Sequence, residues 1–434
     1  MVLIIVVMLL FSYLLIATGH LTGVNKAAIA TFLGTISWVV FVIWSKDFSQ
    51  EVFLGYVGRA AAIVMFLLAT MSIIEILNNN GCFDFINEWI RTRNSKRLLW
   101  TISLATFVLS ATLDNLATTM LMLVIMHSIV KSRSQRMLIG SAIVLAACCG
   151  GCFTVIGDCT GLLLWGDEVV TATQFSAHLA LPALVAWVVP TIFINRELPS
   201  RLDIEWTVAP YRGDDTRLNR WQRLLMLIVG IGGLWFVPTF LSLTRLSPFL
   251  GALCVLAILW VVNEAFNRKL MNADQMSQRR FPRVLQYGAI QQMLFVMGIM
   301  LGFGAATETG VLSAIARWME ANVDSIWIIG IVSGFLSGLV DMFTIAVSDI
   351  SIAESLHGVS TTTGPFAQNG AFWLVTAYTT AVGGCLLSVG SASGIALMQM
   401  EHIRLGWYLK RIAPKVLVGW LLGMAVLYAE TLFF

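Results

Sequence analysis

Long apolar runs constrain what this chain can fold into more than any other feature. A helix needs about 20 mostly apolar residues to cross the hydrocarbon core of a bilayer. Hydrophobic residues make up 58% of the 434 and charged residues only 12%, too few to cover a globule with polar surface. The sequence therefore predicts an all-α polytopic membrane protein. Spans are expected at residues 1–18, 27–44, 53–77, 137–165, 174–194, 223–241, 248–266, 288–316, 371–401 and 416–433.

The first of these runs begins at Met1 with no basic segment before it, and no clear small-residue cleavage site follows it. A secretory signal peptide carries both features. We therefore expect residues 1–18 to be a retained first helix.

Two further apolar stretches, 98–130 and 327–353, are predicted to be re-entrant hairpins. The first is too long for one perpendicular span, at about 50 Å if helical throughout, and basic residues flank it at both ends. Since basic loops favour the cytoplasmic face, both ends are expected there. No Lys or Arg occurs between Arg317 and Arg404. The second hairpin is therefore expected to open on the outer side.

The order of segments is the same in both halves of the chain. Residues 1–194 and 223–434 each comprise three spans, a hairpin with an aspartate, a span interrupted by a glycine-rich phrase, and one more span. The basic loops start the first half outside and the second half inside, with 195–222 as a cytoplasmic linker. This order predicts an inverted 5+5 transmembrane repeat, which is typical of secondary transporters. The other predicted cytoplasmic loops are 78–97, 131–136, 267–287 and 402–415.

The glycine-rich phrase occurs twice, as GGCFTVIGD at Gly150–Asp158 and as GGCLLSVGS at Gly383–Ser391. Irregular backbone at membrane depth is tolerated only where protein or a water-filled cavity surrounds it, because lipid satisfies no free N–H or C=O group. We therefore expect the spans 137–165 and 371–401 to break here and to turn carbonyl groups toward an ion. The glycines expected at these breaks are Gly150, Gly151, Gly157, Gly383, Gly384 and Gly390.

Three aspartates lie where the predicted helices are interrupted. Asp114 and Asp341 are in the two hairpins, and Asp158 ends the first glycine phrase. A charge at mid-bilayer costs about 2.5–3.5 kcal/mol on insertion scales, so we expect these carboxylates to bind ions or protons. Hard oxygen ligands suit a small alkali cation. The sequence therefore predicts Na⁺ or Li⁺ at Asp114 and Asp341.

Neutral oxygen ligands are available beside these carboxylates. Asn115, Thr118 and Thr119 follow Asp114 in the first hairpin, and Ser388 and Ser391 lie in the second glycine phrase. Hydroxyl side chains also cap helices and join packed helices in membranes. Either role fits each hydroxyl taken alone.

Two glutamates, Glu75 and Glu308, form a further matched pair near the end of the third span of each half. A carboxylate with little water around it holds a proton more readily, which suits proton uptake and release. The same residues also fit a second interpretation, as solvated side chains at a membrane mouth.

The sequence gives little support for a structural metal site or for an enzyme. Cys148, Cys149, Cys152 and Cys159 fall within one apolar span, whereas structural zinc sites use spaced ligand pairs in polar surroundings. We expect these cysteines to be packing residues. The sequence contains no Ser-His-Asp order, HExxH motif or phosphate-cradling glycine loop. We therefore expect neither an enzyme nor a cofactor, and no nucleic-acid partner.

Several stretches resemble the NhaD-type sodium/proton antiporters of the ion-transporter superfamily. They are VNKAAIA (Val24–Ala30), KRLLWTISLATFVLSATLDNLATTM (Lys96–Met120), GGCFTVIGDCTGLLLW (Gly150–Trp165) and VGGCLLSVGSASGIALMQMEHIRLGWYLKRI (Val382–Ile412). The resemblance implies exchange of Na⁺ or Li⁺ for protons, a bacterial inner membrane and a homodimer with a moving hairpin-bearing part. It implies functional roles for Asp114, Asn115, Thr118, Thr119, Asp158, Asp341, Ser391 and Glu75.

The sequence departs from this family's pattern at three places. Met342 stands where an asparagine usually follows the second hairpin's aspartate, and a thioether binds hard cations poorly. Asn78–Asn80 replace an acidic residue and a histidine, and Cys148 replaces an asparagine. These losses of polar groups predict an altered ion choice or a weakened activity.

Two other functions are kept as alternatives. One is a symporter of the same superfamily that carries a dicarboxylate-like organic anion with Na⁺, although the three aspartates would repel an anion. The other is a non-transporting membrane sensor or subunit on a decayed carrier scaffold, which the lost polar residues would suit.

Overall fold

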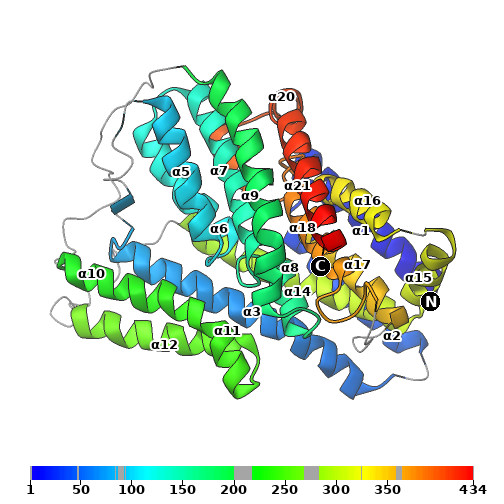
Figure 1. Ribbon diagram of the computed structural model, residues 1–434. Coiled ribbons are helices and arrows are strands. Elements are labelled where there is room, and N and C mark those ends of the chain that lie inside the picture. Colours follow the sequence, from blue (N-terminus) through cyan, green and yellow to red (C-terminus); the bar gives the residue numbers. More distant parts are fainter. Residues whose placement is uncertain are drawn as a thin grey trace.

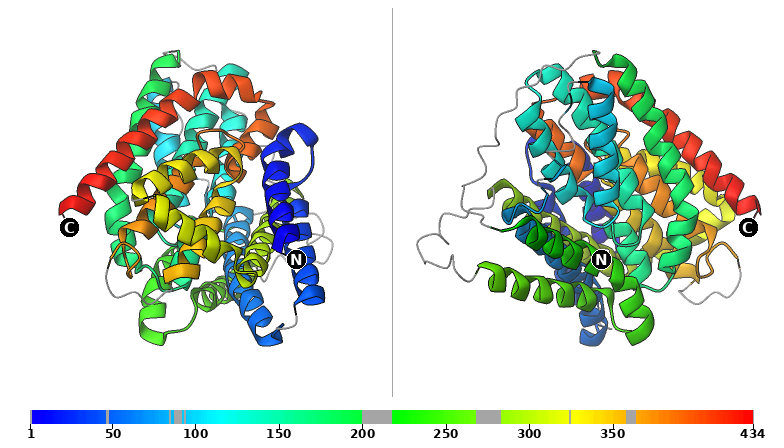
Figure 2. Two further views of the ribbon diagram at one scale, coloured as in Figure 1. Left: turned by 90° about the vertical axis from the view of Figure 1, so that its right-hand side faces the viewer. Right: turned by 60° about the vertical axis from the view of Figure 1, so that its left-hand side comes forward.

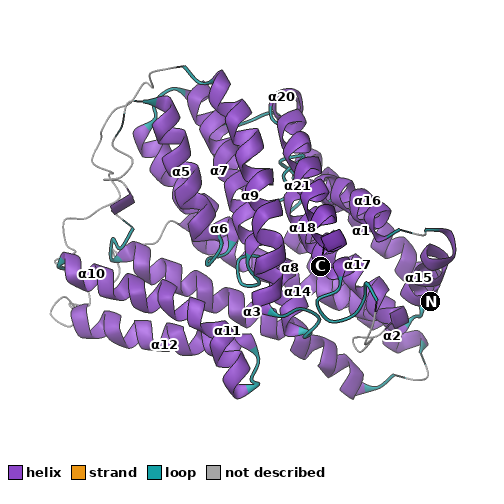
Figure 3. Cartoon of the chain, viewed as in Figure 1, coloured by secondary structure: helices purple, strands orange, loops and turns teal. Residues whose placement is uncertain are grey.

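The computed structural model describes residues 2–45, 48–83, 85–86, 92, 94–199, 218–267, 283–323, 325–357 and 364–433. The regular elements in these ranges are helices (Figure 3). Nine of the described helices are long and apolar enough to cross a membrane. The predicted class, an all-helical multi-pass membrane protein, is confirmed.

The helices of the first half follow the predicted order of spans, hairpin and interrupted span. They are α1 (Val2–Thr22), α2 (Lys26–Trp44), α3 (Gln50–Asn79), the hairpin helices α5 (Ser95–Ser110) and α6 (Asn115–Ile129), the interrupted pair α7 (Arg133–Phe153) and α8 (Cys159–Gly166), and α9 (Ala172–Glu197).

The helices of the second half repeat this order with additional short elements. They are α10 (Arg220–Leu227), the π-helical η1 (Ile228–Gly232), α11 (Gly233–Thr244), α12 (Pro248–Asn267), α14 (Arg283–Glu308), α15 (Val311–Asn322), the hairpin helices α16 (Ile326–Leu339) and α17 (Met342–His357), the interrupted pair α18 (Ala371–Gly383) and α19 (Ala392–Glu401), α20 (Leu405–Arg411) and α21 (Ala413–Phe433).

The helices form two groups that run in different directions (Figures 1 and 2). In Figure 1, α3, α10 and α12 lie across the lower part, and α5, α7 and α9 stand above them. In the lower group α2 packs on α14, and α3 on α12; in the upper group α5 packs on α7, α16 on α18, and α9 on α21. Each of these contacts within the upper group involves a hairpin, an interrupted helix or the span that follows it. The two groups contact each other where α14 and α15 pack on α17, where α14 packs on α6, and where α3 packs on α8.

The span predicted at 288–316 is present but ends earlier, at Glu308. The helix α14 ends at Glu308 and α15 begins at Val311, with Gly310 between them at φ +74°. This left-handed conformation is readily adopted only by glycine, so the chain turns at this residue.

Contacts between loops agree with the predicted sides of the membrane. Arg136 pairs with Glu401 at 2.9 Å, and Lys415 pairs with Glu197 at 2.5 Å, so three predicted cytoplasmic loops lie together. At the predicted outer face, the Asn369 backbone N–H donates to the Val169 carbonyl at 2.8 Å. The predicted linker 195–222 lies outside the described residues between 200 and 217, as do parts of the loops 78–97 and 267–287.

Candidate functional site

Four helix starts meet in the interior of the protein, and a predicted site residue caps each of them. Asp114 precedes α6, Asp158 precedes α8, Asp341 precedes α17 and Ser391 precedes α19. All four are buried. Each side chain accepts a hydrogen bond from a backbone N–H of the first helical turn, at 3.0–3.2 Å for its shortest bond. The positive ends of four helix dipoles therefore point toward these residues, which favours negative charge there.

Hydrogen bonds connect the two hairpins to the two interrupted helices at these helix starts. The Asn115 amide donates to the Asp158 carboxylate at 3.0 Å, and the Ser393 hydroxyl donates to the Asn115 carbonyl at 3.1 Å. The Met342 N–H donates to the Gly390 carbonyl at 2.9 Å. Residues that are far apart in the sequence are thus brought into one polar centre.

Glycines allow the hairpins to approach the interrupted helices closely. A Cβ added to Gly150 would overlap the Phe107 carbonyl of α5, and one added to Gly383 would overlap Gly334 of α16. Near these contacts the Ser110 hydroxyl donates to a carbonyl of α7 at 2.7 Å. In both contacts one backbone packs directly against another and leaves no room for a side chain. This explains why both phrases have a glycine at this position.

The break in the first interrupted helix comes later than the sequence predicts. The helix α7 continues to Phe153, so Gly150 and Gly151 are helical, and only Thr154–Asp158 is irregular. In the second half, Gly383 is the last residue of α18, and Gly384–Ser391 is irregular. Glycine at these helical positions serves close packing rather than unwinding.

The two halves make matching contacts at a constant spacing. Cys152 and Cys385, which are 233 residues apart, donate to the carbonyls of Ala377 and Val144 at 3.8 and 3.9 Å. Val144 and Ala377 are themselves 233 residues apart. Each half thus makes the same contact with the other half.

Five buried oxygens at the first hairpin have no hydrogen-bond partner among the described residues. Buried polar atoms of proteins are nearly always hydrogen-bonded, so this group indicates a bound species. One carboxylate oxygen and four neutral oxygens, next to the Asp158 carboxylate, form a ligand set suited to a small hard cation. The atoms are Asp114 Oδ1, Asn115 Oδ1 and the hydroxyls of Thr118, Thr119 and Thr160.

Asp341 has a different environment, because the ammonium group of Lys26 contacts it. The Lys26 Nζ lies 3.3 Å from Asp341 Oδ2, 3.3 Å from the Val340 carbonyl and 2.7 Å from the Val389 carbonyl. No pattern of charges or motifs in the sequence marks Lys26 as a site residue. The only sequence signal was its place in VNKAAIA at the start of a span.

None of the remaining predicted residues supplies one of the unpaired oxygens. Ser388 is buried, and its hydroxyl lies 3.0 Å from the Met398 sulfur. Glu308 is exposed at the end of α14 and accepts a hydrogen bond from Tyr56 at 3.0 Å. Glu75 is half-buried in α3. All seven cysteines are free thiols, and the described residues contain no cluster of His, Cys, Asp and Glu able to hold a metal ion.

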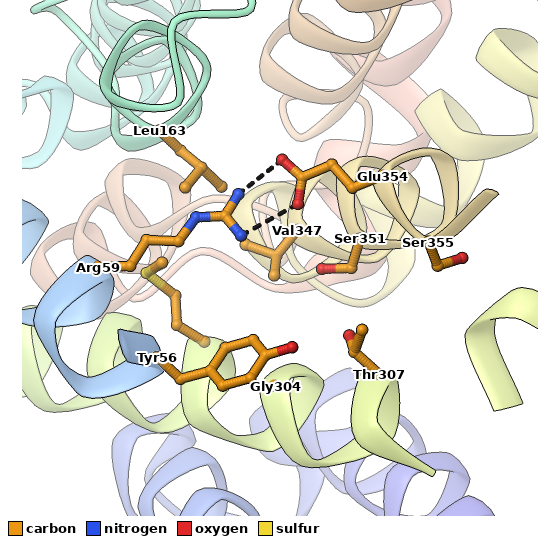
Figure 4. Close-up of a pocket in the computed structure, with 10 residues that line it drawn as sticks. Tyr56, Arg59, Leu163, Gly304, Thr307, Val347, Ser351, Glu354 and Ser355 are labelled. Atoms are coloured by element: carbon orange, nitrogen blue, oxygen red, sulfur yellow. Dashed lines mark hydrogen bonds and ion pairs between the residues drawn. The ribbon is translucent and has the colours of Figure 1, made fainter. Parts of the chain in front are cut away.

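Arg59 of α3 joins two carboxylates from other elements. Its guanidinium donates to Glu354 of α17 at 2.8 and 3.0 Å and also pairs with Asp167, which follows α8. Figure 4 shows the ion pair with Glu354 beside a cavity of about 220 Å³.

Burial raises the pKa of the Asp167 carboxyl to about 6, although the Arg59 charge opposes this shift. The Arg59–Asp167 pair therefore weakens as the pH falls below about 6.

We expect Arg59→Met to lower the free energy of unfolding by about 2–4 kcal/mol, because it leaves two largely buried carboxylates without their counter-charge. Arg59 is itself 29% exposed, which reduces the effect. The melting temperature of the purified protein in detergent measures it. Adding Asp167→Asn and Glu354→Gln to Arg59→Met should restore most of the loss. An unchanged melting temperature in the single variant would contradict this role for the ion pairs.

The fold is similar to that of a solved transporter. The crystal structure of the Alcanivorax borkumensis YdaH transporter, described as having an unusual topology, superposes with a TM-score of 0.62 at 11% sequence identity. The match covers 94% of this chain and 99% of that chain. The likeness gives the fold class: a multi-pass helical membrane protein with hairpins and interrupted helices.

Sequence comparison gives the family. The model of the CitMHS family, described as citrate transporters, matches residues 1–347, and the chain belongs to this family. Sodium/proton antiporter 1 of Arabidopsis thaliana is 30% identical over 410 residues, covering 93% of this chain and 68% of the relative. The Na⁺/H⁺ antiporter NhaD of Halomonas elongata is 26% identical over 425 residues, covering 90% and 80%. The predicted resemblance to NhaD-type proteins is confirmed.

Proposed function

We propose that this protein exchanges Na⁺ or Li⁺ for protons across the membrane. The observation that carries the proposal is the group of buried, unpartnered oxygens around Asp114 and Asp158. The names of the relatives in Arabidopsis and Halomonas, sodium/proton and Na⁺/H⁺ antiporter, support the same activity.

The mechanism is a competition for the two carboxylates. Asp114 and Asp158 bind either a cation or protons, and only the neutralised site moves across the membrane. Asn115 positions Asp158 through the hydrogen bond between their side chains, and Thr118 and Thr119 supply further oxygens. Because each bound species excludes the other, the carrier exchanges them.

We also propose that the two halves are inverted repeats, with the boundaries 1–194 and 223–434. The reciprocal contacts of Cys152 and Cys385 support this, as do the matched helix caps at Asp114 and Asp341. The upper group of helices, which carries both hairpins, is the part that moves against the lower group. The homodimer and the bacterial inner membrane stay predictions from the family resemblance. The absence of enzymatic activity stays a prediction from the missing motifs, and the proton-linked roles of Glu75 and Glu308 stay predictions from their matched positions.

The family description motivates a second candidate, a citrate-like organic anion carried with Na⁺. Such a substrate is recognised by neutral hydrogen-bond donors and helix N-termini. Here two carboxylates occupy the first pair of helix N-termini, so an anion would meet repulsion there. The geometry favours a cation.

Everted membrane vesicles test the proposal. An acid-inside ΔpH should collapse when Na⁺ or Li⁺ is added to vesicles that contain the protein, and not in vesicles without it. Labelled citrate or succinate should not accumulate. Citrate uptake without cation-dependent proton movement would replace our proposal with the second candidate.

A further inference from the structure

Lys26 supplies a cation to the second hairpin from within the chain. It is the first residue of α2, and Asn25 caps the helix by accepting a hydrogen bond from the Ala27 N–H at 2.9 Å. The Lys26 ammonium contacts one carboxylate oxygen and two backbone carbonyls, of Asp341, Val340 and Val389. A compact ammonium with three donors accepts the same oxygen ligands as a small alkali cation.

The matching position in the first half contains no such group. The hairpin residues Leu113 and Asp114 lie 227 positions before Val340 and Asp341, and Ile156 lies 233 positions before Val389, so these three are the matching residues of the first half. In the described residues no Lys or Arg pairs with Asp114 or Asp158. Instead Asp114 Oδ1 is buried without a hydrogen-bond partner.

The sequence differences between the halves agree with this asymmetry. Asn115, Thr118 and Thr119 correspond to Met342, Ile345 and Ala346, and Asp158 corresponds to Ser391. Each of these four differences removes an oxygen ligand or a charge from the second half. One difference goes the other way: Ala117 corresponds to Thr344, whose buried hydroxyl has no hydrogen-bond partner among the described residues. A position already filled by an ammonium group needs fewer ligands, which gives a physical reason for the thioether of Met342.

We propose that Lys26 is a tethered cation that permanently fills the second site, so that each chain has one exchangeable cation site, formed by Asp114 and Asp158. This inference rests on the proposed function and replaces the expectation of a second Na⁺ or Li⁺ at Asp341. Because Lys26 lies on α2 and Asp341 on the hairpin, the same contact joins the two groups of helices.

Binding of ²²Na⁺ to the purified full-length protein, measured at saturation, tests the proposal without transport. The wild type should bind one Na⁺ per chain. Lys26→Met should expose Asp341 and raise the stoichiometry to two, with the new site weaker because Met342 supplies no hard ligand. Lys26→Arg, the matched control, keeps the charge and should stay at one. The double variant Lys26→Met/Asp341→Asn should return to one.

The outcomes separate this inference from the proposed function. Two Na⁺ per wild-type chain, or only one in well-folded Lys26→Met, would overturn the tethered cation and leave exchange intact. If Lys26→Met does not fold, the double variant Lys26→Met/Asp341→Asn decides the question. A double variant that binds no Na⁺ would assign the exchangeable cation to Asp341 and overturn the tethered cation. No saturable Na⁺ or Li⁺ binding by the wild type, together with no exchange in vesicles, would overturn the proposed function itself.

Discussion

Asp114→Asn is expected to abolish cation-dependent proton movement in everted vesicles and to weaken Na⁺ binding by at least about 100-fold. The substitution removes one of two carboxylates from a site with no other charged group among its described ligands. Even groups that contact a metal site indirectly change affinity by about 10–100-fold when mutated. A directly binding carboxylate should have a larger effect.

The choice of asparagine separates the charge of Asp114 from its structural role. The Asp114 carboxylate caps α6 by accepting hydrogen bonds from the N–H groups of Leu116 and Ala117 at 3.0 and 3.3 Å. An asparagine accepts the same bonds, so α6 should keep its start. The melting temperature without Na⁺ should therefore be close to that of the wild type. Exchange at more than a tenth of the wild-type rate in Asp114→Asn would remove Asp114 from the site.

Gly150→Ala is expected to lower the stability of the folded protein substantially. An added Cβ would overlap the Phe107 carbonyl, which belongs to the backbone of α5 and has no other rotamer to adopt. Inserting atoms into a packed interior costs about 1–3 kcal/mol, and a rigid neighbour favours the upper end of this range. We expect a lower melting temperature and a smaller folded fraction on size-exclusion chromatography.

Gly58 offers a matched control for this prediction. It is also a helical glycine, in α3, but an added Cβ would meet no atom within 4 Å. Alanine there should stabilise the helix by about 0.5–1 kcal/mol relative to glycine. If Gly150→Ala behaved like Gly58→Ala, α5 and α7 would not be in close contact in the folded protein.

The sequence predicted the membrane class, nearly all spans, and the two hairpins, because these depend on local composition. About 20 apolar residues cross a bilayer in any context, and Asp114 and Asp341 stand out against apolar flanks. The helix ends were less predictable. Gly150 and Gly151 resemble an unwound segment in sequence, whereas both are helical in the structure, and Gly150 packs against the backbone of α5.

The candidate site was predictable in its residues but not in its balance of charge. Matching positions in two repeats predict two cation sites, at Asp114 and Asp341. The structure instead brings Lys26 to Asp341, across 315 positions of the chain. No local pattern predicts which helix start will reach a hairpin that distant in sequence.

The sequence by itself therefore determined that the chain lies in a membrane, that two hairpins and two spans are interrupted, and which carboxylates stand at the interruptions, but not where each helix ends. Apolar runs, glycines and isolated charges act locally, so these features can be recognised without the fold. Only the tertiary structure decided which of these carboxylates has a positively charged partner. Lys26 neutralises Asp341, while Asp114 and Asp158 meet with no cation from the described residues. Electrostatic energy depends on distance in space, and the packing of α2 against α14 brings Lys26 to the second hairpin.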